Sequence, residues 1–269
     1  MILLLLLAVH CDYGDGAAIV NGRYKPMEPS LGEVPFQVSL SMRINGSFYP
    51  FCGGSLIHPR WVLTAAHCLE QDGNPFPSNM MYATLGSIYT NGKGGQRIKV
   101  ETFVMNRKYF ESDSGYDIGV VKLSTNAQLG RNVKLIKLHI NNKESLIGTT
   151  AFLAGFGIIN DHYQEPVRLR KAVLHIDNPS KCFVSAPANY PEICCTSTLS
   201  EGKACKGDSG GPLFIKQNGR HIQVGITSHL AILPVCIVNF NNSVYTRVSA
   251  YIGWLLRATG IDFTKYNQS

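Results

Sequence analysis

A serine embedded in glycines stands near the C-terminal end of the chain, in surroundings that suit covalent chemistry. The stretch GKACKGDSGGP (202–212) contains this residue, Ser209. An alcohol is a poor nucleophile at neutral pH, so it needs a base within hydrogen-bond reach, and that base needs a third group to orient it. The glycines leave the approach to the hydroxyl open and permit backbone angles that other residues resist. Taken alone, the stretch also fits a tight turn with an incidental serine.

Two other stretches supply a base and an orienting carboxylate. LTAAHC (63–68) contains His67 beside small residues, and YDIGVVKL (116–123) places Asp117 directly before an apolar strand. Each is ambiguous by itself, because a lone histidine is usually structural and an aspartate before a strand is usually a turn residue. Together they give the chain order His67, Asp117, Ser209, which is one known order of base, orienting group and nucleophile. We therefore predict a serine nucleophile activated by a histidine.

Short strands must position these residues. FQVSLS (36–41) alternates apolar and polar residues like a half-buried strand, and AVLHID (172–177) and HIQVGIT (221–227) predict further strands. GGSLI and WVLT flank a turn built on HPR. Many short strands with glycine and proline between them favour a sandwich or a barrel.

A helix is predicted at the C-terminal end, over about 249–259. Ser249 stands at a suitable capping position and Gly260 at a suitable stop. Its apolar face combines Ile252, Leu255, Leu256 and Thr259. A polar stretch, KLHINNKES (137–145), is suited to join two halves of the chain.

Composition and charge narrow the class of protein. The 269 residues are 45% apolar and 16% charged, which fits one large domain or two small ones and argues against a disordered chain. The net charge is +7, for which we favour a solvated basic face over a surface for acidic partners. No run of Lys or Arg and no nucleic-acid motif stands out, so we expect no nucleic-acid partner.

The first residues predict export. MILLLLLAV fits the apolar region of a secretory signal peptide, and no stretch reaches the roughly 18 apolar residues that a membrane span needs. The eight cysteines include no C-x-x-C pair, so in an exported chain they favour disulfides over a zinc ribbon or a redox site. We therefore expect a secreted, extracellular protein, with candidate glycosylation sites at Asn45, Asn241 and Asn267.

The chain resembles the trypsin/chymotrypsin family of serine peptidases. The motifs that carry the resemblance are IVNG (19–22), CGGSLI, WVLTAAHC, DIGVVKL, CKGDSGGP and VYTRV, and they extend over nearly the whole chain. The resemblance implies an all-β fold of two six-stranded antiparallel β-barrels with the active site between them and a C-terminal helix. The implied division is a signal peptide over 1–18, alone or with a short propeptide, and a peptidase domain over 19–269. Within that domain the first barrel covers about 19–136 and the second about 137–246.

The resemblance also implies a role for each site residue. His67 is the general base and then the general acid, Asp117 orients it, and Ser209 is the nucleophile. The N–H groups of Gly207 and Ser209 form the oxyanion hole, and Ser228 supports Asp117. The implied activity is a secreted endopeptidase that cleaves proteins or peptides through an acyl-enzyme intermediate. We expect a monomer that needs no cofactor, with protein inhibitors as candidate partners.

The cysteines fit the same resemblance. The implied disulfides are Cys52–Cys68, Cys182–Cys194 and Cys205–Cys236. Cys195 could compete for Cys182, and if Cys11 leaves with the signal peptide one of the remaining cysteines is unpaired. The segment 87–100 corresponds to a calcium loop in some relatives but contains no Asp or Glu, so we expect no metal site.

Departures from the family lie around the expected specificity pocket. Trypsins carry Asp six residues before the serine, where this chain has Lys203, and a cation there repels Arg and Lys side chains of a substrate. The family's SWG reads Ser228, His229, Leu230 here, and Ser243 stands where a glycine is usual. Leu230 could partly close the pocket.

Lys203 leaves three outcomes open. Its ammonium could attract acidic side chains, pair with a carboxylate such as Glu201 and leave a neutral pocket, or fold across a pocket narrowed by Leu230 and leave little activity. In none of these cases do we expect cleavage after Arg or Lys. The alternative function is a catalytically weak or inactive homologue that acts as a binding or regulatory protein, and the intact triad argues against it. A binding module with no enzymatic past would not combine the six motifs.

Activation raises a further question. Family members become active when a new N-terminus, here Ile19, pairs with the Asp before the serine, here Asp208. Most relatives have Arg or Lys before that terminus, whereas Ala18 precedes it here. Gly16 and Ala18 have the small side chains that signal peptidase prefers, so signal removal itself could release Ile19. The competing interpretation is a short propeptide removed by another peptidase.

Overall fold

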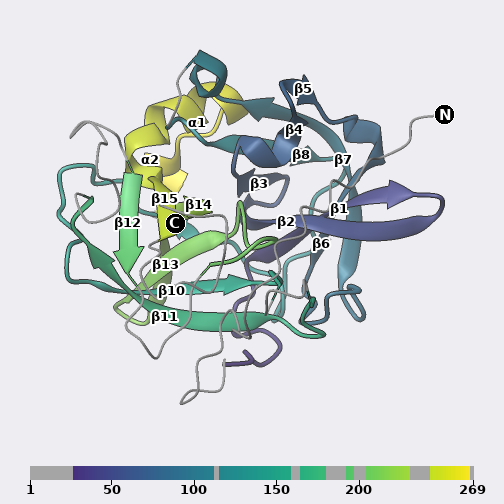
Figure 1. The fold of residues 1–269 in the computed structure, drawn as a ribbon, viewed down its shortest axis with the longest axis horizontal. Coiled ribbons are helices and arrows are strands. Elements are labelled where there is room, and N and C mark those ends of the chain that lie inside the picture. The colour runs from purple at the N-terminus through teal and green to yellow at the C-terminus, as the bar shows by residue number, and fades with distance from the viewer. Residues whose placement is uncertain are drawn as a thin grey trace, which may run out of the picture.

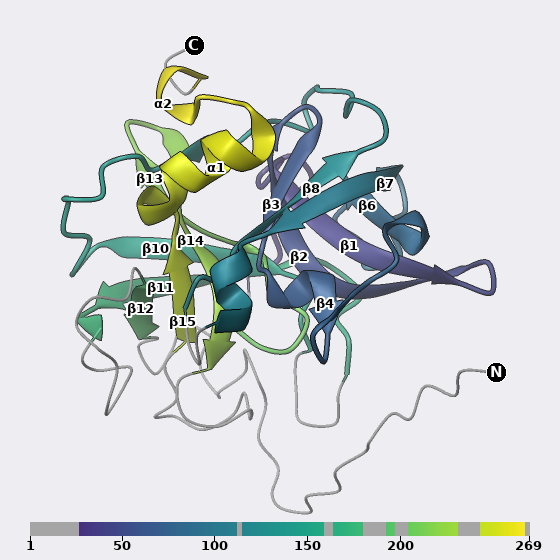
Figure 2. The ribbon, with the colours of Figure 1, turned by 90° about the horizontal axis from the view of Figure 1, so that it is seen from above.

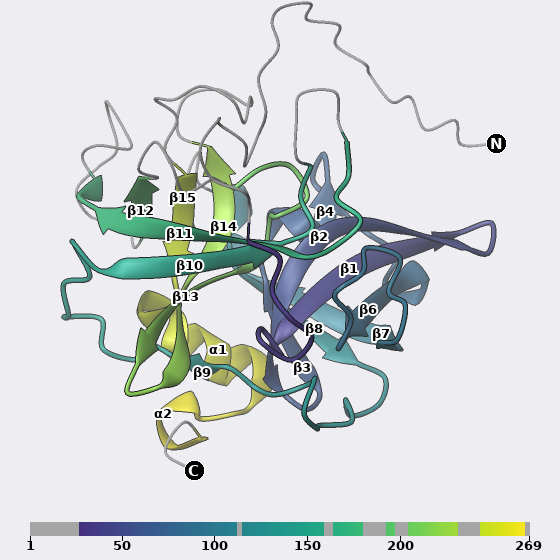
Figure 3. The same cartoon turned by 90° about the horizontal axis from the view of Figure 1, so that it is seen from below.

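The computed structural model describes residues 27–111, 115–158, 164–179, 192–196, 204–230 and 243–266, with the backbone alone for Glu111, 192–196 and Leu230. Figure 1 shows two β-rich halves, with the strands of the first half on the right and those of the second on the left and below. Figure 3 gives the same arrangement from below, with β10 and β11 on the left and β1 on the right.

The first half is a closed antiparallel barrel with the strand order β1-β2-β3-β8-β7-β6. Its strands are β1 (Gln37–Ile44), β2 (Ser47–His58), β3 (Trp61–Thr64), β6 (Met81–Leu85), β7 (Gln96–Met105) and β8 (Gly119–Leu123). Between them lie the short pair β4 (Glu70–Gln71) and β5 (Asn74–Pro75) and the 3-10 turns η1 (His67–Leu69), η2 (Ser78–Met80) and η3 (Arg107–Glu111). The predicted six-stranded barrel of this half is confirmed.

Strand β1 is buried on both faces, so the prediction of a half-buried strand was wrong. Val38 is fully buried, as its alternation predicts, but Gln37 is only 5% exposed. The second half of the chain covers the polar face, because a Cβ added to Gly53 would lie 3.0 Å from the Gly211 backbone and 3.5 Å from the Gln37 amide. The alternation of apolar and polar residues within one strand does not show what packs on its polar face. Here that face is covered by a segment that lies far along the chain.

The second half is a seven-stranded sheet with the order β13-β10-β11-β12-β15-β14-β9, and β13 also pairs with β14. Its strands are β9 (Lys137–Leu138), β10 (Thr150–Gly155), β11 (Arg170–Asp177), β12 (Glu192–Thr196), β13 (Pro212–Gln217), β14 (Arg220–Leu230) and β15 (Ser243–Arg247). All pairings are antiparallel except that of β9 with β14. A second closed barrel stays a prediction.

Two helices follow β15 and pack back on the first half. A 3-10 turn, η5 (Val248–Tyr251), leads into α1 (Ile252–Thr259), and α2 (Phe263–Tyr266) comes after it. Figure 2 shows α1 beside β3 and β8, and the fully buried Leu255 belongs to the core of the first half. The C-terminal segment therefore connects the two halves, because it leaves the sheet of the second half and packs on the core of the first.

The predicted C-terminal helix is confirmed, but its beginning differs from the prediction. Residues 248–251 form the 3-10 turn, so the N-cap of α1 is Tyr251 and not Ser249. The Ser249 hydroxyl instead accepts a hydrogen bond from Arg247 Nε at 2.9 Å. The helix ends at Gly260, as predicted, where a φ of 76° lets the N–H group bond to the Leu256 carbonyl. Within the described residues, no helix has the length and apolarity that crossing a bilayer requires.

A buried side-chain hydrogen bond links the two halves. Ser55 on β2 donates to Gln223 Oε1 on β14 at 2.6 Å, and Gln223 Nε2 donates to the Gly225 carbonyl. Both side chains are fully buried. A buried amide oxygen that loses its donor retains the cost of its desolvation, so this bond matters more for stability than its length suggests.

We predict that Ser55→Ala lowers the free energy of unfolding by about 1–3 kcal/mol, because Gln223 Oε1 is left buried without a donor. The measurement is urea unfolding followed by fluorescence. Ser124→Ala is the matched control, because Ser124 is exposed and should change stability by less than about 0.5 kcal/mol. Equal midpoints for the two variants would contradict the prediction.

Candidate active site

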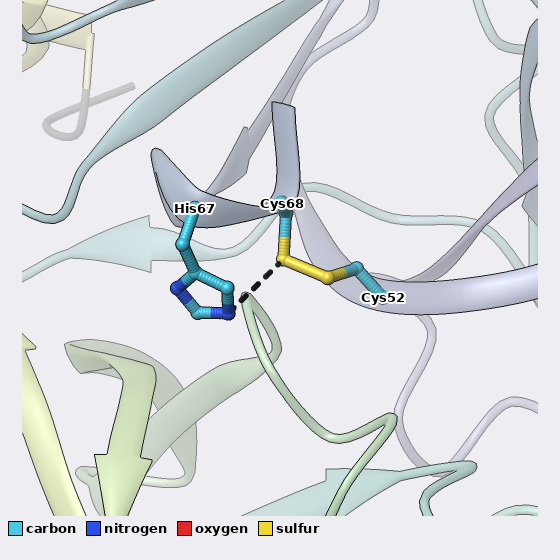
Figure 4. Close-up of side chains that lie close together, drawn as sticks. All are labelled: Cys52, His67 and Cys68. Carbon is cyan, nitrogen blue, oxygen red and sulfur yellow. Dashed lines mark hydrogen bonds between the residues drawn. A yellow bond between two sulfur atoms is a disulfide. The ribbon is translucent and has the colours of Figure 1, made fainter. Parts of the chain in front are cut away.

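A disulfide fixes the segment that carries His67. Cys52 on β2 is bonded to Cys68, the residue after His67 in η1, with 6.1 Å between the Cα atoms (Figure 4). This is one of the three pairings that the resemblance implies. The bond holds the histidine against the barrel wall, so its ring position does not depend on the short η1 turn alone.

Asp117 is the centre of the polar contacts in the site. It lies just before β8 and is 5% exposed. Its Oδ1 accepts the backbone N–H of His67 at 3.0 Å, and its Oδ2 accepts His67 Nδ1 at 2.8 Å and the Ser228 hydroxyl at 2.6 Å. An ionised carboxylate only accepts, so the proton of the His67 ring is on Nδ1 and leaves Nε2 able to act as a base.

The two charges tune each other. Burial lowers the pKa of His67, but the charge and the hydrogen bond of Asp117, with a contribution from Glu70, outweigh it and raise this pKa above its usual value. Burial raises the pKa of Asp117. The charge and hydrogen bonds of His67 and the hydrogen bond from Ser228 have a larger effect, so the pKa lies below its usual value. Asp117 is therefore ionised at neutral pH, and His67 is a base matched to that range.

Both halves of the chain hold the loop that carries Ser209. The Ser209 carbonyl accepts the N–H of Gly53 on β2 at 2.7 Å, and the N–H of Gly210 donates to Thr227 on β14 at 2.8 Å. Gly210 has a φ of 77°, and a Cβ there would lie 2.1 Å from Thr64 Oγ1. A side chain at this position would push the serine loop away from the first barrel, so glycine is required.

Ser209 is half-buried, and its hydroxyl is not bonded to the histidine. Among the hydrogen bonds of the described residues, none joins Ser209 Oγ to His67 Nε2. That ring nitrogen instead lies 3.7 Å from Cys68 Sγ (Figure 4). Bonds between a nucleophile and its base are often long without substrate and tighten when substrate binds.

Two backbone N–H groups beside the serine are available for a ligand. In the described part of the chain, the N–H groups of Gly207 and Ser209 donate to no protein acceptor, whereas those of Asp208, Gly210 and Gly211 do. Gly207 adopts a φ of 92°, a backbone angle that favours glycine. Preset donors of this kind can stabilise a developing oxyanion.

Asp208 is a buried carboxylate in a cradle of glycines. It is 1% exposed and accepts the N–H groups of Gly157 at 2.8 Å and Cys205 at 2.9 Å. A Cβ on Gly155 would lie 1.9 Å from its Oδ1, and one on Gly157 would lie 2.5 Å from its Cγ. Burial raises the pKa of Asp208 to about 6, although the two backbone bonds oppose the shift. No cation among the described residues pairs with it, and Ile19 lies outside them.

The expected specificity pocket is described only in part. Ser243 is 3% exposed at the start of β15 and pairs in the sheet with Leu230 and Cys195. His229 Nδ1 lies 3.0 Å from the Ser228 hydroxyl. Lys203, its candidate partner Glu201 and the side chain of Leu230 lie outside the described residues.

Several other predicted positions also lie outside the described residues. These are Cys11, Gly16, Ala18, Cys182, Cys236, Asn241 and Asn267, together with the side chains of Cys194 and Cys195. Cys205 is disulfide-bonded, and its expected partner Cys236 is among the residues just named. Asn45 is exposed at the tip of the β1–β2 hairpin, with a φ of 51°.

Sequence reasoning missed supporting residues around the site. Thr246, within the VYTRV motif, donates to the backbone carbonyl of Asp117 at 2.9 Å. Burial, Asp117 and Glu70 together raise the pKa of Tyr109 to about 12, so its phenol stays neutral beside the site. The glycines of GFG (155–157) were the one available signal for the Asp208 cradle, because two glycines around an aromatic residue suggest a close approach.

The sulfur atoms next to His67 do not form a metal site. The ligand atoms of Cys52, His67 and Cys68 all lie within 4.8 Å of one another. Metal ligation by cysteine needs a thiolate, and both of these sulfurs are consumed in the disulfide.

Comparisons with known proteins agree with this geometry. The Trypsin family model matches residues 21–255. The fibrinolytic enzyme isozyme C of Lumbricus rubellus is 32% identical over 236 residues, covering 84% of this chain and 95% of that protein. Chymotrypsin-like elastase family member 3B of Homo sapiens is 33% identical over 266 residues, covering 94% of each chain. Chymotrypsin of Phaedon cochleariae is 32% identical over 241 residues, covering 88% of this chain and 80% of that protein. The resemblance is thus confirmed, and the chain belongs to the trypsin/chymotrypsin-like family of serine peptidases, as a serine endopeptidase.

Proposed function

We propose that this endopeptidase is secreted and cleaves proteins with the triad Ser209, His67 and Asp117 through an acyl-enzyme intermediate. The observation that carries the proposal is the buried Asp117 carboxylate, bonded to His67 Nδ1 at 2.8 Å and to Ser228 at 2.6 Å. This bonding directs Nε2 of the histidine away from the carboxylate, as a general base requires. The disulfide next to His67 and the exposed sequon at Asn45 support an extracellular setting.

The reaction follows from these positions. Ser209 Oγ attacks the peptide carbonyl carbon while His67 Nε2 takes the hydroxyl proton, and Asp117 stabilises the imidazolium that forms. The N–H groups of Gly207 and Ser209 stabilise the oxyanion. The C–N bond then breaks as His67 returns the proton to the leaving amine. Water, deprotonated by the same nitrogen, releases the acyl group and regenerates the serine.

Asp208 receives the new N-terminus in this proposal. A carboxylate held at 1% exposure by two backbone N–H groups, with no cation among the described residues, suits an incoming α-ammonium. We propose Ile19 as that terminus, released by signal peptidase or by removal of a short propeptide. N-terminal sequencing of the freshly secreted protein separates the two routes.

The second half is proposed to close as a six-stranded barrel. The additional pairing of β13 with β14 joins the first strand of the sheet order to the sixth and supports closure. The domain limits follow from it, with the first barrel over about 19–136 and the second over about 137–246. We further propose a monomer, because the active-site residues all belong to one chain.

We predict that Ser209→Ala and His67→Ala each lower kcat by about 10⁶-fold and that Asp117→Asn lowers it by about 10⁴-fold. The measurements are peptide hydrolysis and covalent labelling by an organophosphonate, which requires an activated serine. Ser124→Ala, at an exposed position, serves as the control and should match the unmodified protein. An unmodified protein that is neither labelled nor active would favour the alternative of an inactive binding or regulatory homologue.

We predict that release of Ile19 changes how the stability of the protein depends on pH. With Asp208 unpaired, its folded-state pKa of about 6 exceeds the ordinary 3.8, so the folded state binds the proton more tightly and stability falls as the pH rises through this interval. Pairing with the Ile19 ammonium removes this loss. Urea unfolding between pH 4 and 7 measures it, with the full chain and the chain from Ile19 compared. The same pH slope in both chains would overturn the pairing.

We predict that hydrolysis after Arg is slower than after Glu, Leu or Phe, because Lys203 repels a cationic side chain. The measurement is kcat/KM on matched peptides that differ in the residue before the scissile bond. Lys203→Asp should shift the preference toward Arg, and Lys143→Asp, an exposed lysine elsewhere, should not. Fastest cleavage after Arg by the unmodified protein would remove Lys203 from the pocket.

A further inference from the structure

A bulge in β14 brings a second histidine next to the triad. Consecutive residues of a regular strand point to opposite faces of the sheet. The pairing of β14 with β15 joins Thr227 to Tyr245 and then His229 to Val244, so one extra residue, Ser228, is inserted on β14. Bulges of this kind re-aim side chains. Here the side chains of Ser228 and its neighbour His229 come within hydrogen-bond distance of each other.

The direction of the hydrogen bonds follows from the number of protons. The Ser228 hydroxyl lies 2.6 Å from Asp117 Oδ2 and 3.0 Å from His229 Nδ1. A serine hydroxyl has one proton, and an ionised carboxylate can only accept, so Ser228 donates to Asp117. Ser228 Oγ is then the acceptor toward His229, and Nδ1 of that ring carries the proton. The chain of donors runs from His229 through Ser228 to Asp117.

We propose that His229 is a positioning residue of the active site, which acts through Ser228 on Asp117 and thereby sets the basicity of His67. This inference rests on the proposed triad. It assigns to His229 a role separate from lining the specificity pocket.

The physical effect is polarisation along a chain of hydrogen bonds. A donor to Ser228 Oγ makes its O–H group a stronger donor in turn, by roughly 10–30%. Ser228 and His67 both bond to Asp117 Oδ2. A stronger bond from Ser228 therefore reduces the negative charge that this oxygen presents to His67. Loss of the donor leaves more of that charge facing the imidazolium, so His67 binds its proton more tightly.

Partial removal of its ring from water keeps His229 neutral when the site is active. Among the described residues, the titratable groups that act on it are Asp117, before β8, and His67, in η1. Partial burial lowers the pKa of His229, His67 lowers it further and Asp117 opposes the shift. His67 shifts in the other direction, so on acidification His67 takes up its proton first. The residue His229 is itself exposed, so bulk water can exchange its protons.

Two substitutions separate the hydrogen bond from the bulk of the ring. His229→Asn puts an amide nitrogen close to the position of Nδ1 and keeps the donor without a titrating group. His229→Phe keeps the ring size and removes the donor. The measured quantity is the midpoint of His67 protonation, from imidazole NMR signals of the secreted protein and from the acid limb of kcat/KM.

We expect His229→Phe to raise the His67 midpoint by roughly 0.2–0.6 pH unit, whereas His229→Asn stays within about 0.1 unit of the unmodified protein. A role in packing alone would lower stability or activity at every pH without moving the midpoint. An unmoved midpoint in the Phe variant, or equal shifts in both variants, would overturn the proposal.

The Ser228→Ala background tests the route. Without the hydroxyl, His229→Phe should add no further shift to the His67 midpoint, because the connection to Asp117 is already broken. A further shift of the same size would show direct electrostatics and refute the relay. The outcomes for the triad are distinct: an unmodified protein with no hydrolysis and no organophosphonate labelling removes the proposed function, whereas an active protein with unmoved midpoints removes only the relay.

Discussion

A buried carboxylate is the constraint on which the site depends. A charge removed from water is costly unless hydrogen bonds or an opposite charge replace its solvation. Asp117 meets this requirement with donors from two distant segments: the backbone and ring of His67, and the hydroxyl of Ser228. Each donor is also a residue that the proposed chemistry uses. The same hydrogen bonds therefore stabilise the buried charge of Asp117 and orient His67. Loss of one of them would also destabilise the fold around the site.

The site forms where the two halves of the chain meet. The first barrel contributes the histidine and the aspartate, and the second half contributes the serine loop and Ser228. The main chain of the serine loop is bonded to Gly53 on one side and to Thr227 on the other, which couples its position to both. The fully buried Ser55–Gln223 pair adds a directional side-chain contact to this interface. Hydrogen bonds at this interface fix the register between the halves more sharply than apolar packing could.

Local sequence patterns point to candidate catalytic residues more directly than to their environment. Glycine-rich turns and short motifs single out Ser209, His67 and Asp117 as candidates, because catalysis restricts the residue types at such positions. Contacts between distant segments do not follow from local patterns. The Ser228–Asp117 bond, between residues 111 apart in sequence, was expected only from the family resemblance, and the bulge that aims Ser228 exists only in the pairing of β14 with β15. Burial of the polar face of β1 has the same origin, since Gly211 approaches it from the other half of the chain.

Closure of the first barrel has a consequence for aggregation. Every strand of that barrel (β1, β2, β3, β8, β7 and β6) has a neighbour on each side, so none presents a free row of N–H and C=O groups. Unpaired strand edges are templates onto which other chains add, and they are a common route to aggregation. A closed cylinder removes that template without needing charged or proline residues to guard an edge. The architecture that holds the histidine and the aspartate in place thus also leaves this barrel without a strand edge onto which another chain could add.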